Sequence, residues 1–234
     1  MKNVIYTKVP NFGNIELIDY YDEFLWYYPD CELETKKWVT DNCKDDWIIL
    51  DCGANIGYYT ILFAKLANKG YVYAFEPTDT IVKLKNNLEY HKITNVKIIH
   101  KALADTTCVK RDKIYKIWGK EAEFKSFEFI TIDDFIEGEN VNKIDLIKID
   151  VDSYDFEVLK GAEKTLKKFN PFVIVELNHA LSLRNTSIYH AIEWMKNIGY
   201  DKGSVLDHEN IIFKKNYEFV DVEPFTLLFK RRTL

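Results

Sequence analysis

The sequence predicts an α/β fold, in which a mostly parallel sheet carries helices on both faces. Apolar runs of strand length alternate along the chain with segments of helical periodicity. The clearest unit is residues 47–57, where four apolar residues lead into an acid and a glycine-rich turn, and helical periodicity then resumes directly. In sheets built from such units, ligands bind beyond the carboxyl ends of the strands.

The composition indicates a single globular domain. The chain has 234 residues, of which 47% are hydrophobic and 29% charged, enough to enclose a full core. The formal net charge of −5 argues against sequence-independent binding of nucleic acid, which usually needs a basic face. No signal peptide and no apolar run of membrane-spanning length is recognised, and the four cysteines form no C-x-x-C pair. We therefore expect a reduced, cytoplasmic protein without a membrane span.

Residues 1–45 are expected to form an N-terminal cover segment of the same domain, ahead of the ligand-binding part at 46–234. Strands or a hairpin are predicted within residues 1–29, together with an aromatic cluster. This cluster serves either as a hydrophobic cover or as a flap over the ligand site. Asp30 is predicted to cap a helix at about residues 31–43.

The remaining elements follow from apolar periodicity and from the breakers between them. Gly70 and Pro171 each end a helix just before an apolar run of strand length. Residues 106–130 are expected to be irregular, with short strands. Strands are predicted at 47–50, 71–75, 96–100, 144–149, 172–175 and 225–229, helices at 58–68, 79–91, 155–169 and 187–198, a short helix from 131, and a hairpin of 205–206 with 211–213.

Acidic residues directly follow four of the predicted strands. They are Asp51, Glu76, Asp150 and Glu176. Because the carboxyl ends of parallel strands meet at one edge of a sheet, we expect these side chains to lie close together. One acid in such a place is ordinary, whereas four beside a glycine-rich loop predict a ligand site.

The glycine-rich loop and the second acid favour S-adenosylmethionine as the ligand. The loop reads D-x-G-x-x-x-G rather than the dinucleotide pattern G-x-G-x-x-G, and it lacks the Lys-Ser/Thr of a phosphate-binding loop. Gly53 and Gly57 let a ligand approach the backbone, and Asp51 can accept hydrogen bonds from an ammonium group. Glu76 lies 19 residues beyond Gly57, the spacing of an acid that binds the two hydroxyls of a ribose. An ammonium group and a ribose without a pyrophosphate are the features of S-adenosylmethionine.

Six stretches of the sequence resemble the FkbM family of S-adenosylmethionine-dependent methyltransferases. They are DCGANIGYYT at 51–60, VYAFEP at 72–77, KALAD at 101–105, TIDDF at 131–135, IDLIKIDVDSYDFEVLKGA at 144–162 and PFVIVEL at 171–177. The resemblance implies a Rossmann-like class I methyltransferase fold with seven strands, of which the seventh is reversed, so that 46–234 forms the methyltransferase domain. It also implies O-methylation of a glycan, a polyketide or another small metabolite. Where many members read KIDVEG this sequence reads KIDVDS, so Asp152 shortens a carboxylate side chain and Ser153 replaces a glycine.

The loop, the strand ends and the resemblance together predict the cofactor site. Two tyrosines open the helix after the loop, and the first of them is expected to line the methionine pocket. The expected cofactor-binding residues are Asp51, Gly53, Asn55, Gly57, Tyr58, Glu76, Pro77, Ala102, Leu103, Asp105 and Asp150.

Methyl transfer to an alcohol needs a group that takes the hydroxyl proton, or a metal that lowers the pKa of the hydroxyl. The candidates are Asp152, His179, Asp150, Lys148 and Glu176. His179 titrates closest to neutral pH and suits a base. Lys148 is expected to be ion-paired beside Asp150. If a divalent cation takes part, Mg²⁺ or Mn²⁺ would be held by Asp150 and Glu176.

The expected activity is O-methylation of a sugar or glycan hydroxyl. The acceptor is expected above the fourth and fifth strands, against aromatic residues of the N-terminal segment such as Trp26. The alternatives are a polyketide-like metabolite as acceptor, an N-methyltransferase, and a cofactor-binding module without turnover. Methylation of a nucleic-acid base is disfavoured by the acidic charge and by the missing Asn/Asp-Pro-Pro-Tyr element, and a NAD dehydrogenase by the loop. The expected partner is therefore a small molecule or glycan, not nucleic acid.

Overall fold

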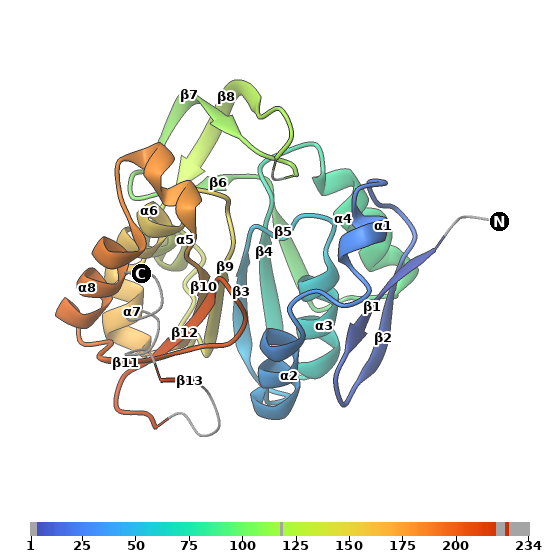
Figure 1. Cartoon of the computed structure of the whole chain (residues 1–234), viewed down its shortest axis with the longest axis horizontal. Helices are drawn as coiled ribbons and strands as arrows, with labels where there is room; N and C mark the ends of the chain where they lie inside the picture. Colours follow the sequence, from blue (N-terminus) through green and yellow to red (C-terminus); the bar gives the residue numbers. More distant parts are fainter. Residues whose placement is uncertain (1–3, 118, 219–222, 225–234) are drawn as a thin grey trace.

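A mixed sheet runs through the centre of the molecule in this computed structural model, which describes residues 4–117, 119–218 and 223–224 (Figure 1). The strand order is β13-β11-β12-β10-β9-β3-β4-β5. Strands β3, β4, β5, β9 and β10 are parallel, whereas β12 runs antiparallel between β10 and β11. The predicted, mostly parallel sheet of seven strands with one reversed strand is confirmed, and the two-residue β13 adds an eighth at the edge. The bounds are β3 Ile48–Cys52, β4 Tyr71–Phe75, β5 Val96–Ile99, β9 Leu146–Ile149, β10 Phe172–Glu176, β11 Lys202–Val205, β12 Asn210–Lys214 and β13 Glu223–Pro224.

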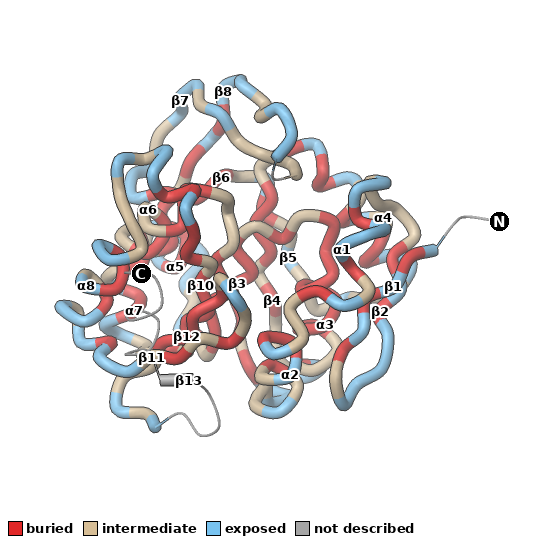
Figure 2. Tube along the Cα trace, in the orientation of Figure 1, coloured by how far each residue is buried: buried red, intermediate tan, exposed pale blue. Residues whose placement is uncertain are grey.

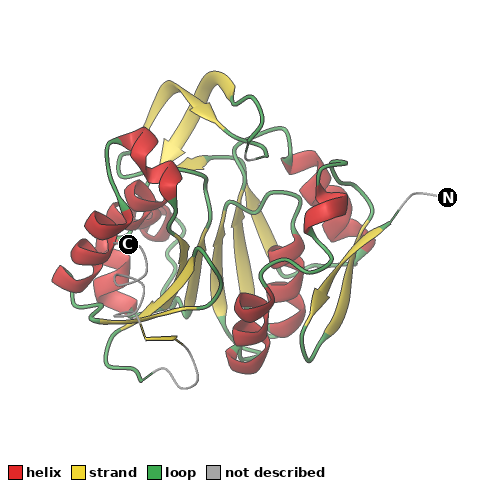
Figure 3. Cartoon of the chain, in the orientation of Figure 1, coloured by secondary structure: helices red, strands yellow, loops and turns green. Residues whose placement is uncertain are grey.

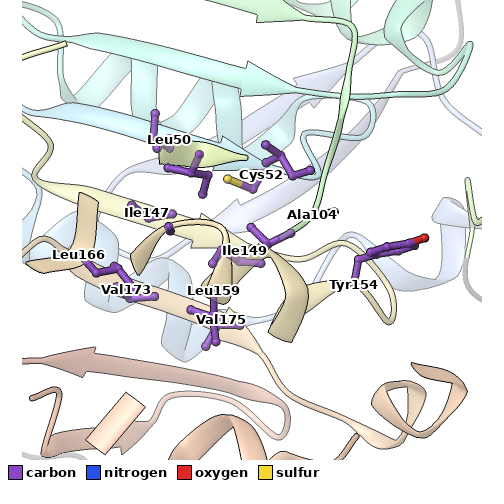
Figure 4. Close-up of a cluster of buried hydrophobic side chains, with 14 of the residues drawn as sticks. Leu50, Cys52, Ala104, Ile147, Ile149, Tyr154, Leu159, Leu166, Val173 and Val175 are labelled. Carbon is purple, nitrogen blue, oxygen red and sulfur yellow. The ribbon is translucent and has the colours of Figure 1, made fainter. Parts of the chain in front are cut away.

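Two hydrophobic cores lie on the two faces of this sheet. The first core contains Leu50, Ile147 and Val173, which Figure 4 draws as part of one cluster. The second contains the neighbouring residues Ile49 and Leu146. Because successive side chains of a strand point to opposite faces, a strand covered on both sides must be apolar throughout. The inner part of the tube in Figure 2 is accordingly buried, with the exposed segments on the outside.

Helices form a layer on each face of the sheet (Figure 3). Helices α5 to α8 contribute to the first core, and α2, α3 and α4 to the second. This arrangement confirms the predicted order of alternating strands and helices. The bounds are α2 Leu33–Asn42, α3 Tyr58–Leu66, α4 Ile81–Tyr90, α5 Ile132–Gly138, α6 Asp155–Lys160, α7 Glu163–Phe169 and α8 Ile188–Asn197.

The N-terminal segment packs on the second core and reaches the edge of the ligand site. It contains the hairpin of β1 Ile5–Val9 with β2 Gly13–Leu17, as predicted, and the short helix α1 Phe24–Tyr27. The Asn87 side chain of α4 ties the segment to the glycine-rich loop: its Oδ1 accepts from the amide of Ile18, and its Nδ2 donates to the carbonyl of the loop residue Ile56 at 2.9 Å.

The predicted cap of α2 is wrong. Asp30 pairs with Lys8 at 2.8 Å instead. The first amides of α2, those of Glu34 and Thr35, donate to the carboxylate of Asp207, at 3.2 and 2.7 Å. A residue from the turn between β11 and β12 therefore caps a helix near the start of the chain, a contact that no local sequence pattern indicates.

The expectation of an irregular segment at 106–130 is also wrong. Strands β7 Cys108–Ile114 and β8 Glu123–Ile130 form a long antiparallel hairpin that stands beyond the end of the main sheet, and β6 Ala102–Leu103 pairs with β8 (Figure 1). Most of β7 is exposed, so it lacks the alternation of apolar and polar residues that predicts a half-buried strand.

The helix predicted at 155–169 is divided into α6 and α7 at Gly161, where a Cβ atom would lie 2.1 Å from the carbonyl oxygen of Ala104. The strand predicted at 225–229 lies outside the described residues. Within the ranges that the structure covers, no helix combines the length and the apolar character needed to cross a membrane.

Candidate active site

The glycine-rich loop crosses the sheet edge in direct contact with the end of β9. Gly53 has a φ of 90°, and a Cβ atom on it would lie 1.8 Å from the carbonyl oxygen of Asp150. Any side chain would push the loop away from the strand, so only glycine fits. Gly57 has a φ of 98° and faces the flexible side chain of Leu84. The two glycines therefore shape the loop, and Gly53 alone brings backbone to the surface of a cavity.

A small cleft of about 510 Å³ opens between this loop, the end of β4 and the β6–β8 sheet. Its apolar walls include Phe75, Phe129 and Tyr154. Of the residues predicted for the cofactor, the structure brings the following to this cleft: Gly53, Asn55, Glu76, Pro77, Ala102, Leu103 and Asp150.

Glu76 is fixed in the small cleft by its own neighbours. It is 6% exposed, and its carboxylate accepts hydrogen bonds from the amide of Thr78 at 2.8 Å, from the Thr78 hydroxyl at 2.6 Å and from the amide of Asn55 at 3.1 Å. Burial raises its pKa, and these donors oppose that effect. A carboxylate held in this way keeps lone pairs for a ligand and needs no rearrangement to bind one.

A larger cavity of about 1270 Å³ adjoins the small cleft. The two share Gly53, Asn55, Asp150 and Asp152. Aromatic residues line the larger cavity from two directions, and those of the N-terminal segment support its interpretation as a flap over the site. They are Phe24, Tyr27 and Tyr28 from the N-terminal segment and Tyr58 and Tyr59 from α3.

Trp26, the aromatic residue that we expected against the acceptor, does not line this cavity. Its side chain is 91% exposed. The neighbouring residues Tyr27 and Tyr28 take the predicted place. A four-residue helix presents adjacent side chains in different directions, and the sequence alone did not indicate which of them faces inward.

Lys148 lies at the floor of the larger cavity and forms the predicted ion pair with Asp150. It is 1% exposed, and its Nζ lies 2.7 Å from Oδ2 of Asp150 and 4.5 Å from the ring centre of Tyr59. Burial alone would lower the pKa of Lys148, but the charges of Asp150, Glu32 and Asp51 raise it above its ordinary value. The ammonium group is therefore a permanent positive charge among acids.

Asp51 lies beneath the site and not in it. It is 1% exposed, lines neither cavity, and accepts a hydrogen bond from Thr60. Burial raises the pKa of Asp51 to about 6, against the opposing charge of Lys148. The prediction that Asp51 receives the ligand's ammonium is thus not supported by its position; it is a partner of Lys148 and of the first turn of α3.

Asp152 occupies the junction of the two cavities. Its φ of 52° and the φ of 107° at Ser153 are both in the left-handed region, so the serine keeps a backbone conformation that favours glycine. The buried carboxylate of Asp155 holds this turn by accepting from the amides of Val151 and Ser153, at 2.9 and 3.1 Å. The turn therefore aims the Asp152 side chain into the site.

The Asp152 carboxylate is half-buried at this junction and has a raised pKa. Within the described residues it accepts no hydrogen bond from the protein. Burial first, and then the charges of Asp150 and Glu76, raise its pKa to about 7. A base whose pKa matches the working pH is the most effective proton acceptor.

The residues of the larger cavity that sequence reasoning missed include Glu32 and Glu209, whereas Asn178 falls in the expected stretch after the fifth strand. Glu32 has a φ of 47°, and its carboxylate accepts from the hydroxyl of Tyr58 and from Nδ2 of Asn210, the latter at 2.7 Å. Burial raises the pKa of Glu32. No motif surrounds these residues, because segments distant in the chain bring them together.

Two predicted residues lie outside the site. His179, the predicted base, is exposed, opens a 3-10 helix at His179–Arg184 and lines neither cavity. Asp105 is exposed and pairs with Lys160 at 2.7 Å. The structure therefore does not support a catalytic role for His179. It does not support a cofactor contact for Asp105 either.

The acids at the strand ends do not fit a divalent cation. No group of three or more His, Cys, Asp or Glu side chains in the described part of the chain could hold a metal ion. Asp150 is already bound to the Lys148 ammonium, which places a positive charge where Mg²⁺ or Mn²⁺ would lie. The metal site that we expected at Asp150 and Glu176 is thus not supported.

The model of the methyltransferase FkbM domain matches residues 51–202. Hexuronic acid methyltransferase AglP of Haloferax volcanii is 26% identical over 166 residues, which are 67% of each chain. Methyltransferase 1 of Beauveria bassiana is 24% identical over 203 residues, covering 70% of this chain and 82% of its own.

Among solved structures, the crystal structure of methyltransferase FkbM from Methylobacillus flagellatus KT superposes with a TM-score of 0.56 at 18% identity. The match covers 74% of this chain but only 44% of that one, and it shows a shared fold. The family model, in contrast, covers more than half of this chain and includes the loop, the strand ends and the turn at Asp152. The chain therefore belongs to the FkbM methyltransferase family.

Proposed function

We propose that this chain is an S-adenosylmethionine-dependent O-methyltransferase that methylates a hydroxyl of a sugar or glycan. The observation that carries the proposal is the pair of adjoining cavities, which meet at the glycine-rich loop and at Asp152, whose carboxylate accepts no hydrogen bond from the described residues. One cavity suits a nucleoside and the other suits a polar acceptor. Their junction is the place where a methyl group could pass from one to the other.

The small cleft would hold the adenosine part of the cofactor. Glu76 would accept hydrogen bonds from the ribose hydroxyls, and the apolar walls at Phe75 and Phe129 would enclose the base. Oδ1 of Asn55 is buried and has no hydrogen-bond partner among the described residues, although Asn55 lines both cavities. An unsatisfied buried acceptor at this position fits a donor supplied by the ligand.

When bound, S-adenosylmethionine would supply a methyl group on a positively charged sulfur, and the methyl transfer would exchange its carbon–sulfur bond for a carbon–oxygen bond to the acceptor. The residues of this chain supply orientation and proton transfer. Asp152 takes the hydroxyl proton of the acceptor. The fixed charge of Lys148 holds the carboxylate of Asp150 in place beside Asp152.

The sugar acceptor is supported by two observations. The cavity combines aromatic rings with carboxylates, which pack against the apolar face of a sugar and bind its hydroxyls. A curated relative of similar sequence is named a hexuronic acid methyltransferase. A polyketide-like metabolite is the alternative acceptor. A reduced, cytoplasmic setting is part of the proposal, and the four free cysteines support it.

Titration calorimetry with S-adenosylhomocysteine tests the cofactor site. The variant Glu76→Ala should bind more weakly by about 1.5–3 kcal/mol, the value of hydrogen bonds to a charged group. The exposed Glu89 of α4 offers a matched control, since Glu89→Ala leaves the small cleft unchanged. Equal affinity of both variants, each shown to be folded, would refute the assignment of Glu76.

A further inference from the structure

Two carboxylates of the larger cavity share one amide nitrogen. Nδ2 of Asn178 donates to Oε2 of Glu176 at 3.0 Å and to Oε2 of Glu209 at 3.1 Å. The two carboxylate oxygens therefore lie within about 6 Å of each other, where like charges repel strongly. Oδ1 of Asn178 accepts from the amide of Ala180 at 2.8 Å, which fixes the orientation of the amide group.

The backbone keeps this pair in place. Glu176 is the last residue of β10, and it pairs in register with Asn210, the first residue of β12. The amide of Leu177 donates to the carbonyl of Glu209 at 2.9 Å. The end of β10 and the residue just before β12 therefore bring both glutamates to the cavity wall before any ligand arrives.

No lysine or arginine in the described ranges neutralises the pair. Lys148, the nearest cation at the cavity floor, is bound to Asp150 at 2.7 Å. At the rim, Lys116 pairs with Asp79 and Lys120 with Glu23. His208 is exposed, and its Nδ1 lies 4.0 Å from the Glu209 carboxylate.

Other groups add to the negative charge inside the cavity. Glu32, Asp150 and Asp152 also line it, and the three lysines that line it in the described part of the chain are each paired with another acid, Lys116 with Asp79, Lys120 with Glu23 and Lys148 with Asp150. The cofactor brings two positive charges and one negative charge, so an excess of carboxylates remains after it binds. Burial, and then the charges of Asp150, Asp155 and Asp152, raise the pKa of Glu176 against the opposing charge of Lys148.

The cavity also contains a buried hydroxyl group that could form a hydrogen bond with a ligand. Tyr59 is 4% exposed and lines the cavity, and its hydroxyl has no hydrogen-bond partner among the described residues. The rings of Tyr28 and Tyr58 lie in the same wall. Aromatic faces beside carboxylates are the usual surroundings of a bound ammonium group.

We propose that the acceptor carries a protonated amine near the hydroxyl that is methylated, as an amino sugar does, and that Glu176 and Glu209 bind this ammonium. The inference rests on the proposed function and specifies its substrate. The methyl group goes to oxygen, because an ammonium nitrogen has no free electron pair. A sugar carboxylate is repelled, so this chain differs in acceptor charge from the relative that is named for hexuronic acid.

A matched panel of acceptors tests the proposal. Methyl glycosides of glucosamine, N-acetylglucosamine and glucuronic acid differ in one charged group. With saturating S-adenosylmethionine, kcat/KM for the amine should exceed that for the neutral sugar by roughly 10–100-fold, the factor for a hydrogen bond to a charged group. The uronic acid should react most slowly. Equal or higher kcat/KM for the neutral sugar or the uronic acid would overturn the proposal.

Variants show whether Glu176 and Glu209 cause the preference for the amine. Glu209→Gln should bring the amine-to-neutral ratio of kcat/KM close to one, whereas the control Glu193→Gln, at an exposed position of α8, should leave the ratio unchanged. A Glu209→Gln variant that keeps the full ratio would also overturn the proposal.

Binding measurements separate this proposal from the proposed function. Calorimetry with S-adenosylhomocysteine alone reports the cofactor site, and the complex is then titrated with the three sugars. If the complex forms and the amine binds more tightly than the neutral sugar, the proposal is supported even without turnover. If it forms and the amine binds no better, only this proposal fails. If S-adenosylhomocysteine does not bind, both the proposed function and the proposal of an amine acceptor fail.

Discussion

Replacing Asp152 by asparagine tests the proton acceptor with the least change to the structure. Asparagine has the same size and tolerates a φ of 52° well, so the turn should keep its conformation. The replacement removes the negative charge and with it the ability to take a proton. We expect kcat to fall by a factor of about 10²–10⁴, the usual contribution of a general base.

The pH dependence supplies a second, independent sign of the same role. The pKa of Asp152 is raised from 3.8 to about 7, and the ionised form is the base. In the wild type, kcat/KM should therefore fall about tenfold per pH unit below about pH 7 and reach a plateau above it. In Asp152→Asn this step should be absent.

The assay is methyl transfer at several pH values, followed by mass spectrometry, with calorimetry on the same samples. Asp105→Asn is the matched control, because Asp105 pairs with Lys160 outside the site. Wild-type activity of Asp152→Asn, or an unchanged pH step in that variant, would refute the assignment. Loss of S-adenosylhomocysteine binding would mean that Asp152 serves the cofactor and not the acceptor.

Two further predictions concern stability. In Lys148→Met the buried Asp51 and the half-buried Asp150 lose their cation, so the free energy of unfolding in urea should fall by about 3 kcal/mol; an unchanged midpoint would show that these acids need no partner. Ser153→Gly removes a side chain from a residue with a φ of 107°, and should raise the free energy of unfolding by about 1 kcal/mol. A lower value would indicate that the Ser153 side chain makes a stabilising contact.

The strand-end acids show what the sequence can predict. A buried strand followed by an acid and glycines specifies both the strand and the side of the sheet, and Glu76, Asp150 and Glu176 lie where this reasoning places them. Asp51 follows the same pattern but points into the protein, beside Lys148 on the neighbouring strand. A shift of the strand by one residue moves a side chain to the other face of the sheet. The sequence pattern does not fix the strand end to within one residue, so it does not predict which way the last acid points.

The rest of the cavity depends on contacts between distant parts of the chain. Glu32 meets Asn210, which lies 178 residues further along, and Asp207 caps α2. The β7–β8 hairpin is largely exposed, so its residues carry little apolar periodicity. The pattern of apolar residues in one sequence predicts which positions are buried and where local turns lie. It does not predict which loops come together over the edge of a sheet.

The position of the transferred methyl group tests the central claim most directly. S-adenosylmethionine labelled with ¹³C in its methyl group is incubated with the enzyme and the amino sugar, and the product is examined by NMR. We predict a new signal of a methyl group bonded to oxygen on the acceptor, absent with Asp152→Asn over the same time. A label on nitrogen or carbon, or no transfer to any sugar by an enzyme that binds S-adenosylhomocysteine, would contradict the account.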